Sequence, residues 1–130
     1  LGWCNTQYPE THSGTVGGSF TFYGQVWASG VTEGDYQGEG IIAQFGIGPR
    51  DTLCVNNPQW QWFDAIYNGS GYPNETNNDY YRFNLIFQIS GLYDYVFRFS
   101  GDGGLTWLYG DTDGSHTGTT VDKQGKLTVN

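Results

Sequence analysis

Residues 79–111 read DYYRFNLIFQISGLYDYVFRFSGDGGLTWLYGD, and apolar and polar positions alternate along them almost without a break. A period of two predicts β-strands that bury one face. The side chains expected on the buried faces are Tyr81, Phe83, Leu85, Phe87 and Ile89 of a first strand, Tyr93, Tyr95, Phe97 and Phe99 of a second, and Leu105, Trp107 and Tyr109 of a third. Turn residues at 90–91 and 101–104 indicate that hairpins join these three strands.

The same pattern extends over the rest of the chain. Further strands are expected over 20–29, 40–47 and 60–67, and a closing hairpin over 119–121 and 126–129. Together these segments predict an all-β fold, an immunoglobulin-like antiparallel β-sandwich of about seven or eight strands. Two regions are expected. Residues 1–19 are polar and form an extended N-terminal arm, and residues 20–130 form the β-sandwich domain.

The composition excludes several classes of partner. The chain has 130 residues and a formal net charge of −8, with five Lys and Arg against 13 Asp and Glu. Nucleic acids require a basic surface, and so do anionic membrane surfaces, so neither is an expected partner. No apolar run approaches the roughly 20 residues that span a bilayer, and no membrane insertion is expected.

The cysteines and the first residue point to a secreted protein. The chain contains no Met and starts at Leu1, which is typical of a chain whose secretion signal has been cleaved. Cys4 and Cys54 are the two cysteines, and they are expected to form a disulfide. The alternative is a pair of buried free thiols. Sequons at Asn68 and Asn74 predict N-glycosylation sites in one polar loop.

Residues that could carry chemistry are few. Asp111 and Asp113 suggest a weak calcium site, but Gly114 falls at the wrong position for an EF-hand loop, and a turn is the simpler interpretation. The two histidines, His12 and His116, lack the partners that a catalytic relay or a metal site needs. We therefore expect no catalytic residues, no metal and no cofactor.

The most suggestive cluster is the pair Trp60 and Trp62, which fall on the same face of one strand. Exposed, coplanar aromatic rings can bind the apolar faces of sugars. A Trp at this place in a sandwich is also typical of a core residue. The sequence favours a core position for at least one of the two and leaves both interpretations open.

Five stretches resemble the strands of immunoglobulin- and fibronectin-III-like modules of secreted bacterial proteins. They are FYGQVWASGVTEG, GIIAQFGIGP, WQWFDAIYN, GLYDY and FRFSGDGGLTWLYGD. The resemblance covers about residues 20–114 and implies a non-catalytic module. Some related sandwiches accompany starch- or glycan-active enzymes as carbohydrate-binding modules, and residues 1–19 lie outside the resemblance.

Two functions follow as hypotheses. The first is a structural protein, a self-assembling subunit of an extracellular filament, pilus or surface coat, in which the arm adds a strand to a neighbouring copy of the chain. Its partner would be the chain itself. The alternative is a carbohydrate-binding module that uses exposed Trp and Tyr rings to bind glycans. Neither hypothesis makes the chain an enzyme.

Overall fold

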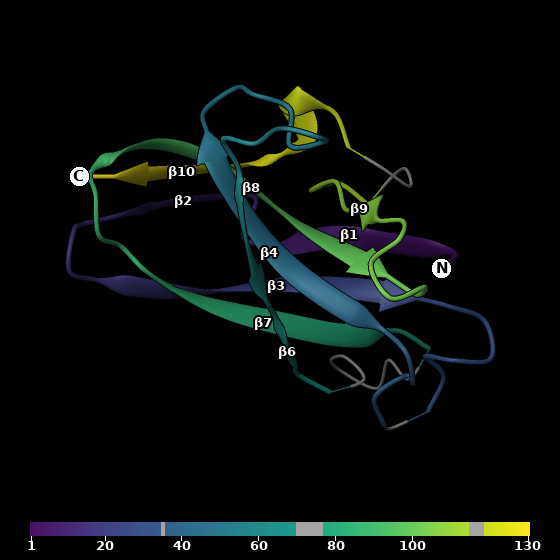
Figure 1. Ribbon diagram of the computed structural model, residues 1–130. Helices are drawn as coiled ribbons and strands as arrows, with labels where there is room; N and C mark the ends of the chain where they lie inside the picture. Colours follow the sequence, from purple (N-terminus) through teal and green to yellow (C-terminus); the bar gives the residue numbers. More distant parts are fainter. Residues whose placement is uncertain (35, 70–76, 115–118) are drawn as a thin grey trace.

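The computed structural model describes residues 1–34, 36–69, 77–114 and 119–130, and in this part of the chain ten strands form two sheets (Figure 1). The four-stranded sheet contains, in spatial order, β1 (Trp3–Tyr8), β3 (Ser19–Trp27), β7 (Asp79–Ile86) and β6 (Ile66–Tyr67). The six-stranded sheet contains β2 (Thr11–Gly14), β10 (Gly125–Val129), β8 (Gly91–Ser100), β4 (Ile42–Pro49) and β5 (Gln61–Asp64), with β9 (Leu108–Tyr109) beside β8. The predicted all-β sandwich is confirmed.

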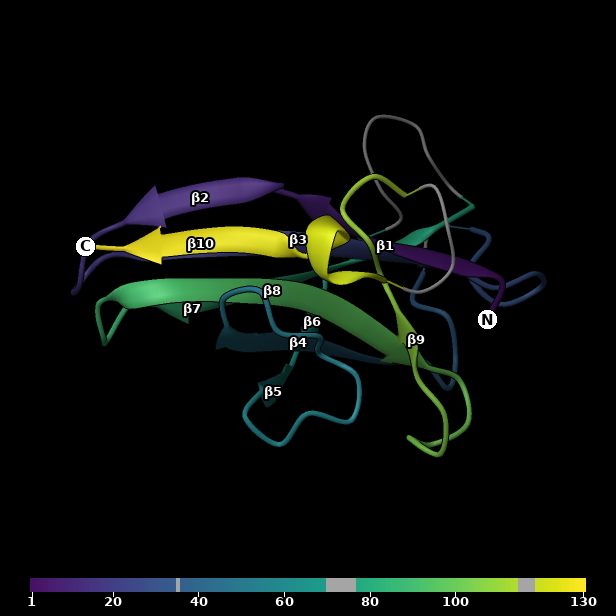
Figure 2. The same ribbon diagram turned by 90° about the horizontal axis from the view of Figure 1, so that it is seen from above.

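Aromatic rings fill the space between the two sheets, which lie face to face in Figures 1 and 2. Phe22 of β3 packs against Phe45 of β4 and Tyr95 of β8, with ring centroids 5.1 and 4.7 Å apart. Phe97 meets Phe45 edge-on at 5.3 Å. Each of these side chains is fully buried, and burial of one such ring stabilises a fold by roughly 1.5–3 kcal/mol. The alternation in the sequence correctly predicted that Tyr95 and Phe97 share the buried face of β8.

The predicted pairing of the strands in residues 79–111 is partly wrong. β7 pairs with β3 in one sheet, whereas β8 pairs with β4 and β10 in the other. Residues 87–90 therefore connect the two sheets and do not close a hairpin. Two residues expected inside are exposed, Ile89 by 72% and Leu105 by 85%, because both lie in connections. The alternation gives the buried face of a strand but not the sheet to which the strand belongs.

The end of the chain also differs from the expected hairpin. Val121–Lys123 forms a single turn of 3-10 helix, η1. The strand that follows, β10, pairs antiparallel with β8 and parallel with β2. In the part of the chain that the structure describes, no helix is long and apolar enough to cross a membrane.

Residues 1–19 do not form an extended arm. β1 pairs antiparallel with β3, from Trp3 opposite Trp27 to Tyr8 opposite Tyr23, and β2 pairs with β10 in the other sheet. The chain passes from one sheet to the other at Pro9, whose carbonyl oxygen accepts a hydrogen bond from the buried Tyr95 hydroxyl. The N-terminal residues are thus strands of their own domain.

The predicted disulfide is not formed, because Cys4 and Cys54 are free and buried in different clusters. Cys4 lies in the core between the sheets. Cys54 packs with Trp60 and Val96 on the outer face of the six-stranded sheet, so that sheet separates the two thiols. Burial raises the pKa of both thiols, that of Cys54 to about 12, which leaves them protonated at neutral pH.

We predict two free thiols per chain. Denaturation without reductant, followed by alkylation and measurement of the intact mass, should add two alkyl groups. A mass that changes only after reduction would show that the cysteines are bridged.

His12 should make the stability depend on pH. Its ring stacks on Phe20 at 3.7 Å, and burial lowers its pKa below the ordinary 6.5. The unfolded chain therefore binds a proton more readily than the folded one, so this stabilisation is complete above about pH 6.5 and is lost as the pH falls below it. The free energy of unfolding, measured by denaturant titration at pH 7, 6 and 5, should fall less in His12→Phe than in the wild type. Equal decreases in both proteins would contradict this role of His12.

Candidate functional site

Two glycines of β4 lie beneath the predicted tryptophan pair. A Cβ atom at Gly46 would lie 2.4 Å from Cζ3 of Trp62, and one at Gly48 would lie 2.4 Å from Cδ1 of Trp60. The two indole rings are nearly parallel, at 27°, with centroids 5.9 Å apart. Trp60 is 4% exposed and Trp62 is half-buried. The structure thus brings the predicted pair together, and both rings pack on the outer face of the six-stranded sheet.

Arg98 of β8 stacks on two tryptophans. Its guanidinium carbon lies 3.9 Å from the ring centroid of Trp62 and 4.0 Å from that of Trp107. Tyr109 of β9 meets Trp62 edge-on, at 5.9 Å. A guanidinium between two indoles gains cation–π attraction from both, about 0.5–2 kcal/mol each. Trp62 and Trp107 are both half-buried, and Arg98 contacts both rings.

A chain of hydrogen bonds leads from Arg98 to a carboxylate. Gln44 lies opposite Arg98 in the β4–β8 ladder, and its Oε1 accepts from Nε and Nη2 of Arg98, at 3.0 and 2.6 Å. The Nε2 of Gln44 donates to Oδ1 of Asp64, at 3.1 Å. Asp64 ends β5 and is exposed. The guanidinium therefore fixes the orientation of the Gln44 amide, and the amide in turn orients the Asp64 carboxylate.

These groups border a groove of about 500 Å³ beside the start of β4. Its lining includes Gln37, Ile42, Gln44, Asp64, Gly104 and Trp107, whereas neither Trp60 nor Trp62 lines it. The volume lies within the range of roughly 300–1,000 Å³ found for small-molecule sites. An indole ring with an amide and a carboxylate beside it is a surface that can bind a neutral, hydroxyl-rich molecule.

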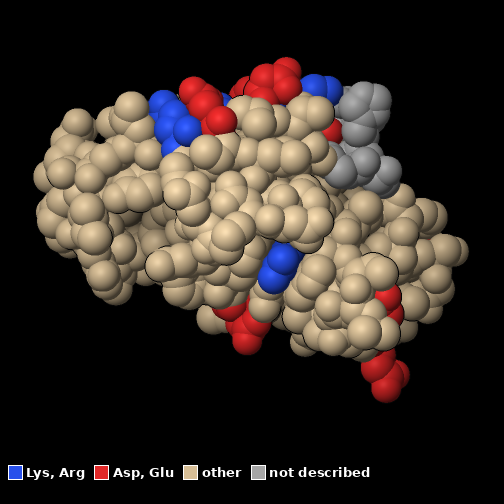
Figure 3. All heavy atoms as spheres, turned by 45° about the horizontal axis from the view of Figure 1, so that its top comes forward, with Lys and Arg blue, Asp and Glu red and all other residues tan. Residues whose placement is uncertain are grey.

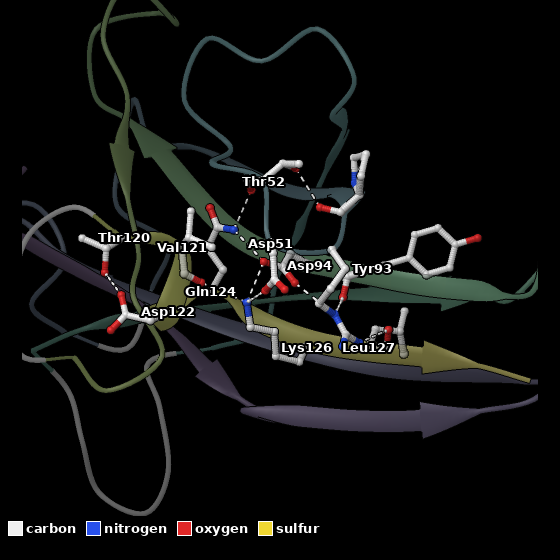
Figure 4. Close-up of polar contacts among 12 residues, drawn as sticks. Asp51, Thr52, Tyr93, Asp94, Thr120, Val121, Asp122, Gln124, Lys126 and Leu127 are labelled. Carbon is white, nitrogen blue, oxygen red and sulfur yellow. Dashed lines mark hydrogen bonds and ion pairs between the residues drawn. The ribbon is translucent and has the colours of Figure 1, made fainter.

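The loop that carries Trp60 is held by a buried carboxylate (Figure 4). Asp94 of β8 is fully buried, and its Oδ2 accepts from Nζ of Lys126 at 2.8 Å and from Nε2 of Gln124 at 2.9 Å. The same Gln124 amide donates to the carbonyl oxygen of Thr52, at 2.8 Å. The Thr52 hydroxyl in turn accepts from the indole Nε1 of Trp60, at 3.0 Å.

Arg50 is the second cation beside the buried Asp94 carboxylate, with its Nε 3.3 Å from Oδ1 of Asp94. Two cations on one buried carboxylate avoid the cost of an unpaired charge, which is roughly 3–5 kcal/mol when one partner is removed. The network of Asp94, Lys126, Gln124 and Arg50 fixes the loop and the place of Trp60 beside Trp62.

Charged side chains gather along the upper edge of the face shown in Figure 3, and most of the remaining surface on that face is uncharged.

A larger groove of about 770 Å³ opens between the two sheets. Its walls are mainly apolar and include Phe63, Phe83, Leu85, Leu92 and Val129, and none of the described residues that line it is charged. Four amide side chains also line it, those of Gln59, Gln61, Asn84 and Gln88. The smaller groove is the candidate site because it combines an indole ring with a carboxylate and an amide that Arg98 orients through hydrogen bonds.

The weak calcium candidates do not come together as ligands. Asp111 is fully buried and forms an isolated β-bridge with Asn5, whereas Asp113 is exposed and pairs with Lys123 at 3.2 Å. Across the described ranges, no group of three or more His, Cys, Asp and Glu could hold a metal ion.

The remaining predicted residues lie outside the groove. Asn68 is exposed, and its Oδ1 accepts from Nη1 of Arg82 at 2.9 Å, so its glycosylation stays a prediction. His12 lies in β2 against the core. Asn74 and His116 fall outside the described residues.

Gly46→Ala should disturb the aromatic stack because the new methyl group would overlap the Trp62 ring. We expect a destabilisation of about 1–3 kcal/mol, as for other overpacked sites, together with a shift in tryptophan fluorescence. Gly101→Ala is the matched control, because a Cβ there approaches only the exposed Leu1 side chain, at 3.3 Å. Equal stability of the two variants in denaturant titrations would show that Trp62 does not depend on Gly46.

No family model matches the chain. It is 32% identical over 144 aligned residues to an amylopullulanase of Thermoanaerobacter thermohydrosulfuricus, a match that covers 93% of this chain and 9% of the relative. It is also 30% identical to an amylopullulanase of Thermoanaerobacterium saccharolyticum and 27% identical to one of Thermoanaerobacterium thermosulfurigenes, over 86% and 83% of this chain. The chain spans a tenth or less of the length of these relatives.

These findings correct the expected function. The hypothesis of a self-assembling filament, pilus or coat subunit is wrong, since proteins similar to nearly the whole chain are amylopullulanases. The pairing of β1 and β2 within their own domain also removes the free arm on which the hypothesis depended. The relatives favour the alternative, a carbohydrate-binding module.

Proposed function

We propose that the chain is a non-catalytic, extracellular carbohydrate-binding module for α-glucans, and that the groove beside Trp107 is its binding site. The observation that carries this proposal is the position of Trp107, stacked on Arg98 at 4.0 Å and lining a groove shared with Gln44 and Asp64. Trp60 and Trp62 then keep the packing role that the sequence analysis considered for them and support the site. The role of sugar contact passes to Trp107.

The chemistry of the groove matches a neutral sugar. A hexose has an apolar C–H face, which can pack on an indole ring, and a rim of hydroxyl groups that need hydrogen-bond partners. Gln44 occupies one oxygen of the Asp64 carboxylate, so the other oxygen can accept from a sugar hydroxyl. Because Arg98 and Gln44 hold these groups in place before binding, little side-chain entropy is lost on association.

The relatives support both the ligand class and the accessory role. Their name, amylopullulanase, points to starch-type glucans and pullulan as ligands. The matched stretch makes up 9%, 10% and 6% of the three relatives, which fits an appended module better than a catalytic domain.

Binding should be measurable with maltoheptaose and pullulan by isothermal titration calorimetry. Trp107→Ala should weaken both by roughly tenfold or more, because it removes the aromatic wall of the groove. Trp27→Ala is the matched control, since Trp27 is also half-buried but does not line the groove. Cellohexaose, a β-glucan, should bind weakly in comparison.

Two results would contradict the proposal. One is a wild-type protein that binds neither α-glucan at millimolar ligand. The other is a Trp107→Ala variant whose affinity equals that of the wild type, which would place any binding site elsewhere on the molecule.

A further inference from the structure

The turn between β8 and β9 carries Trp107 to the groove. It runs over residues 100–106, and Gly103 and Gly104 adopt positive φ angles of 75° and 91° that favour glycine. Trp107 comes directly after this turn and before the first residue of β9. A Cβ at Gly104 would lie 3.6 Å from Cζ2 of Trp107, so the ring packs closely against the turn. The shape of the turn therefore decides where the indole lies.

The carboxylate of Asp102 ties both ends of this turn together. Its Oδ1 accepts from Oγ of Ser100, at 2.7 Å, and from the backbone N–H of Thr106, at 2.9 Å. Its Oδ2 accepts from Oγ1 of Thr106. Ser100 Oγ also accepts from the backbone N–H of Gly104, at 2.9 Å. One side chain thus links the last residue of β8 to the residue that precedes Trp107.

Asp102 remains charged over the working pH range of most proteins. The hydrogen bonds from Thr106, and then that from Ser100, lower its pKa to about 2. A carboxylate that accepts several hydrogen bonds in a fixed geometry is a stronger clamp than a neutral side chain. Asp102 itself does not line the groove, whereas Gly103, Gly104 and Trp107 do.

We propose that Asp102 is the positioning residue of the binding site and acts on the glucan only through Trp107. The inference rests on the proposed function. The closed turn sets the backbone of Trp107 from one side, and Arg98 holds the ring from the other, with its guanidinium carbon 4.0 Å from the centroid. Loss of the clamp should leave the sandwich folded, because residues 100–106 contribute no side chain to the apolar core. The indole would then sample several positions, and binding would pay the entropy of ordering it.

The test compares Asp102→Ala with Asp122→Ala. Asp122 is a matched control because it is also an exposed carboxylate that accepts from a threonine hydroxyl, that of Thr120 at 2.6 Å, and does not line the groove. Affinity for maltoheptaose, measured by calorimetry, should fall roughly tenfold in Asp102→Ala and stay unchanged in Asp122→Ala. Asp102→Asn, which keeps the shape but loses one acceptor, should fall between Asp102→Ala and the wild type.

A second measurement separates positioning from general stability. In the Trp107→Ala background, Asp102→Ala should cause no further loss of affinity, because the ring that it positions is already absent. A further loss there would overturn the positioning role. If the Asp102→Ala variant is too unstable to be titrated, Asp102→Asn replaces it in the same comparison, alone and in the Trp107→Ala background.

The outcomes distinguish this inference from the proposed function. If Trp107→Ala loses affinity while both Asp102 variants bind as the wild type does, Asp102 has no positioning role and the proposed site stands. If the wild type does not bind, or if Trp107→Ala binds as the wild type does, both proposals fail together.

Discussion

Trp60 and Trp62 lie against the six-stranded sheet because β4 presents Gly48 and Gly46 beneath them. With any larger residue at these positions, a Cβ would overlap the indoles, and the rings would have to leave the sheet. Their place on the sheet lets the Arg98 guanidinium stack on Trp62, and the same guanidinium then holds Trp107 on one side and Gln44 on the other. The groove and its polar groups thus depend on the glycines at positions 46 and 48, which have no side chains that would displace the indoles.

The six-stranded sheet therefore has two packed faces with different tasks. The inner face joins the four-stranded sheet in an aromatic core and stabilises the domain. The outer face carries a smaller cluster of Cys54, Trp60 and Val96, fixed at one end by the Asp94 network and followed at the other by the aromatic–arginine stack. Arg98, Gln44 and Asp64 of the candidate site come from strands, and the turn before β9 adds Trp107. Groups that are held in place before the ligand arrives lose less entropy on binding.

The sequence predicted the buried face of β8 because a period of two is a local property of the chain, but it was wrong for β9, where Leu108 packs against the core and Tyr109 lies with the outer cluster. It could not show that β7 and β8 belong to different sheets, because a strand has the same alternation whichever sheet it joins. The polar stretch 1–19 looked unsuited to a sheet, yet its backbone finds partners in β3 and β10. The cysteine pair satisfied every local criterion for a bridge, and only the three-dimensional arrangement places a sheet between the thiols.

The site itself was less predictable. Trp60 and Trp62 were found from their spacing, but Trp107, Arg98, Gln44 and Asp64 come from four separate segments that only the fold brings together. The most direct test of Trp107 as the sugar contact is an NMR titration of the five tryptophan indole N–H signals with maltoheptaose. The Trp107 signal should shift most, and those of Trp3 and Trp27 should remain unchanged. A titration in which Trp107 does not move, or in which shifts are confined to Trp3 and Trp27, would contradict this account.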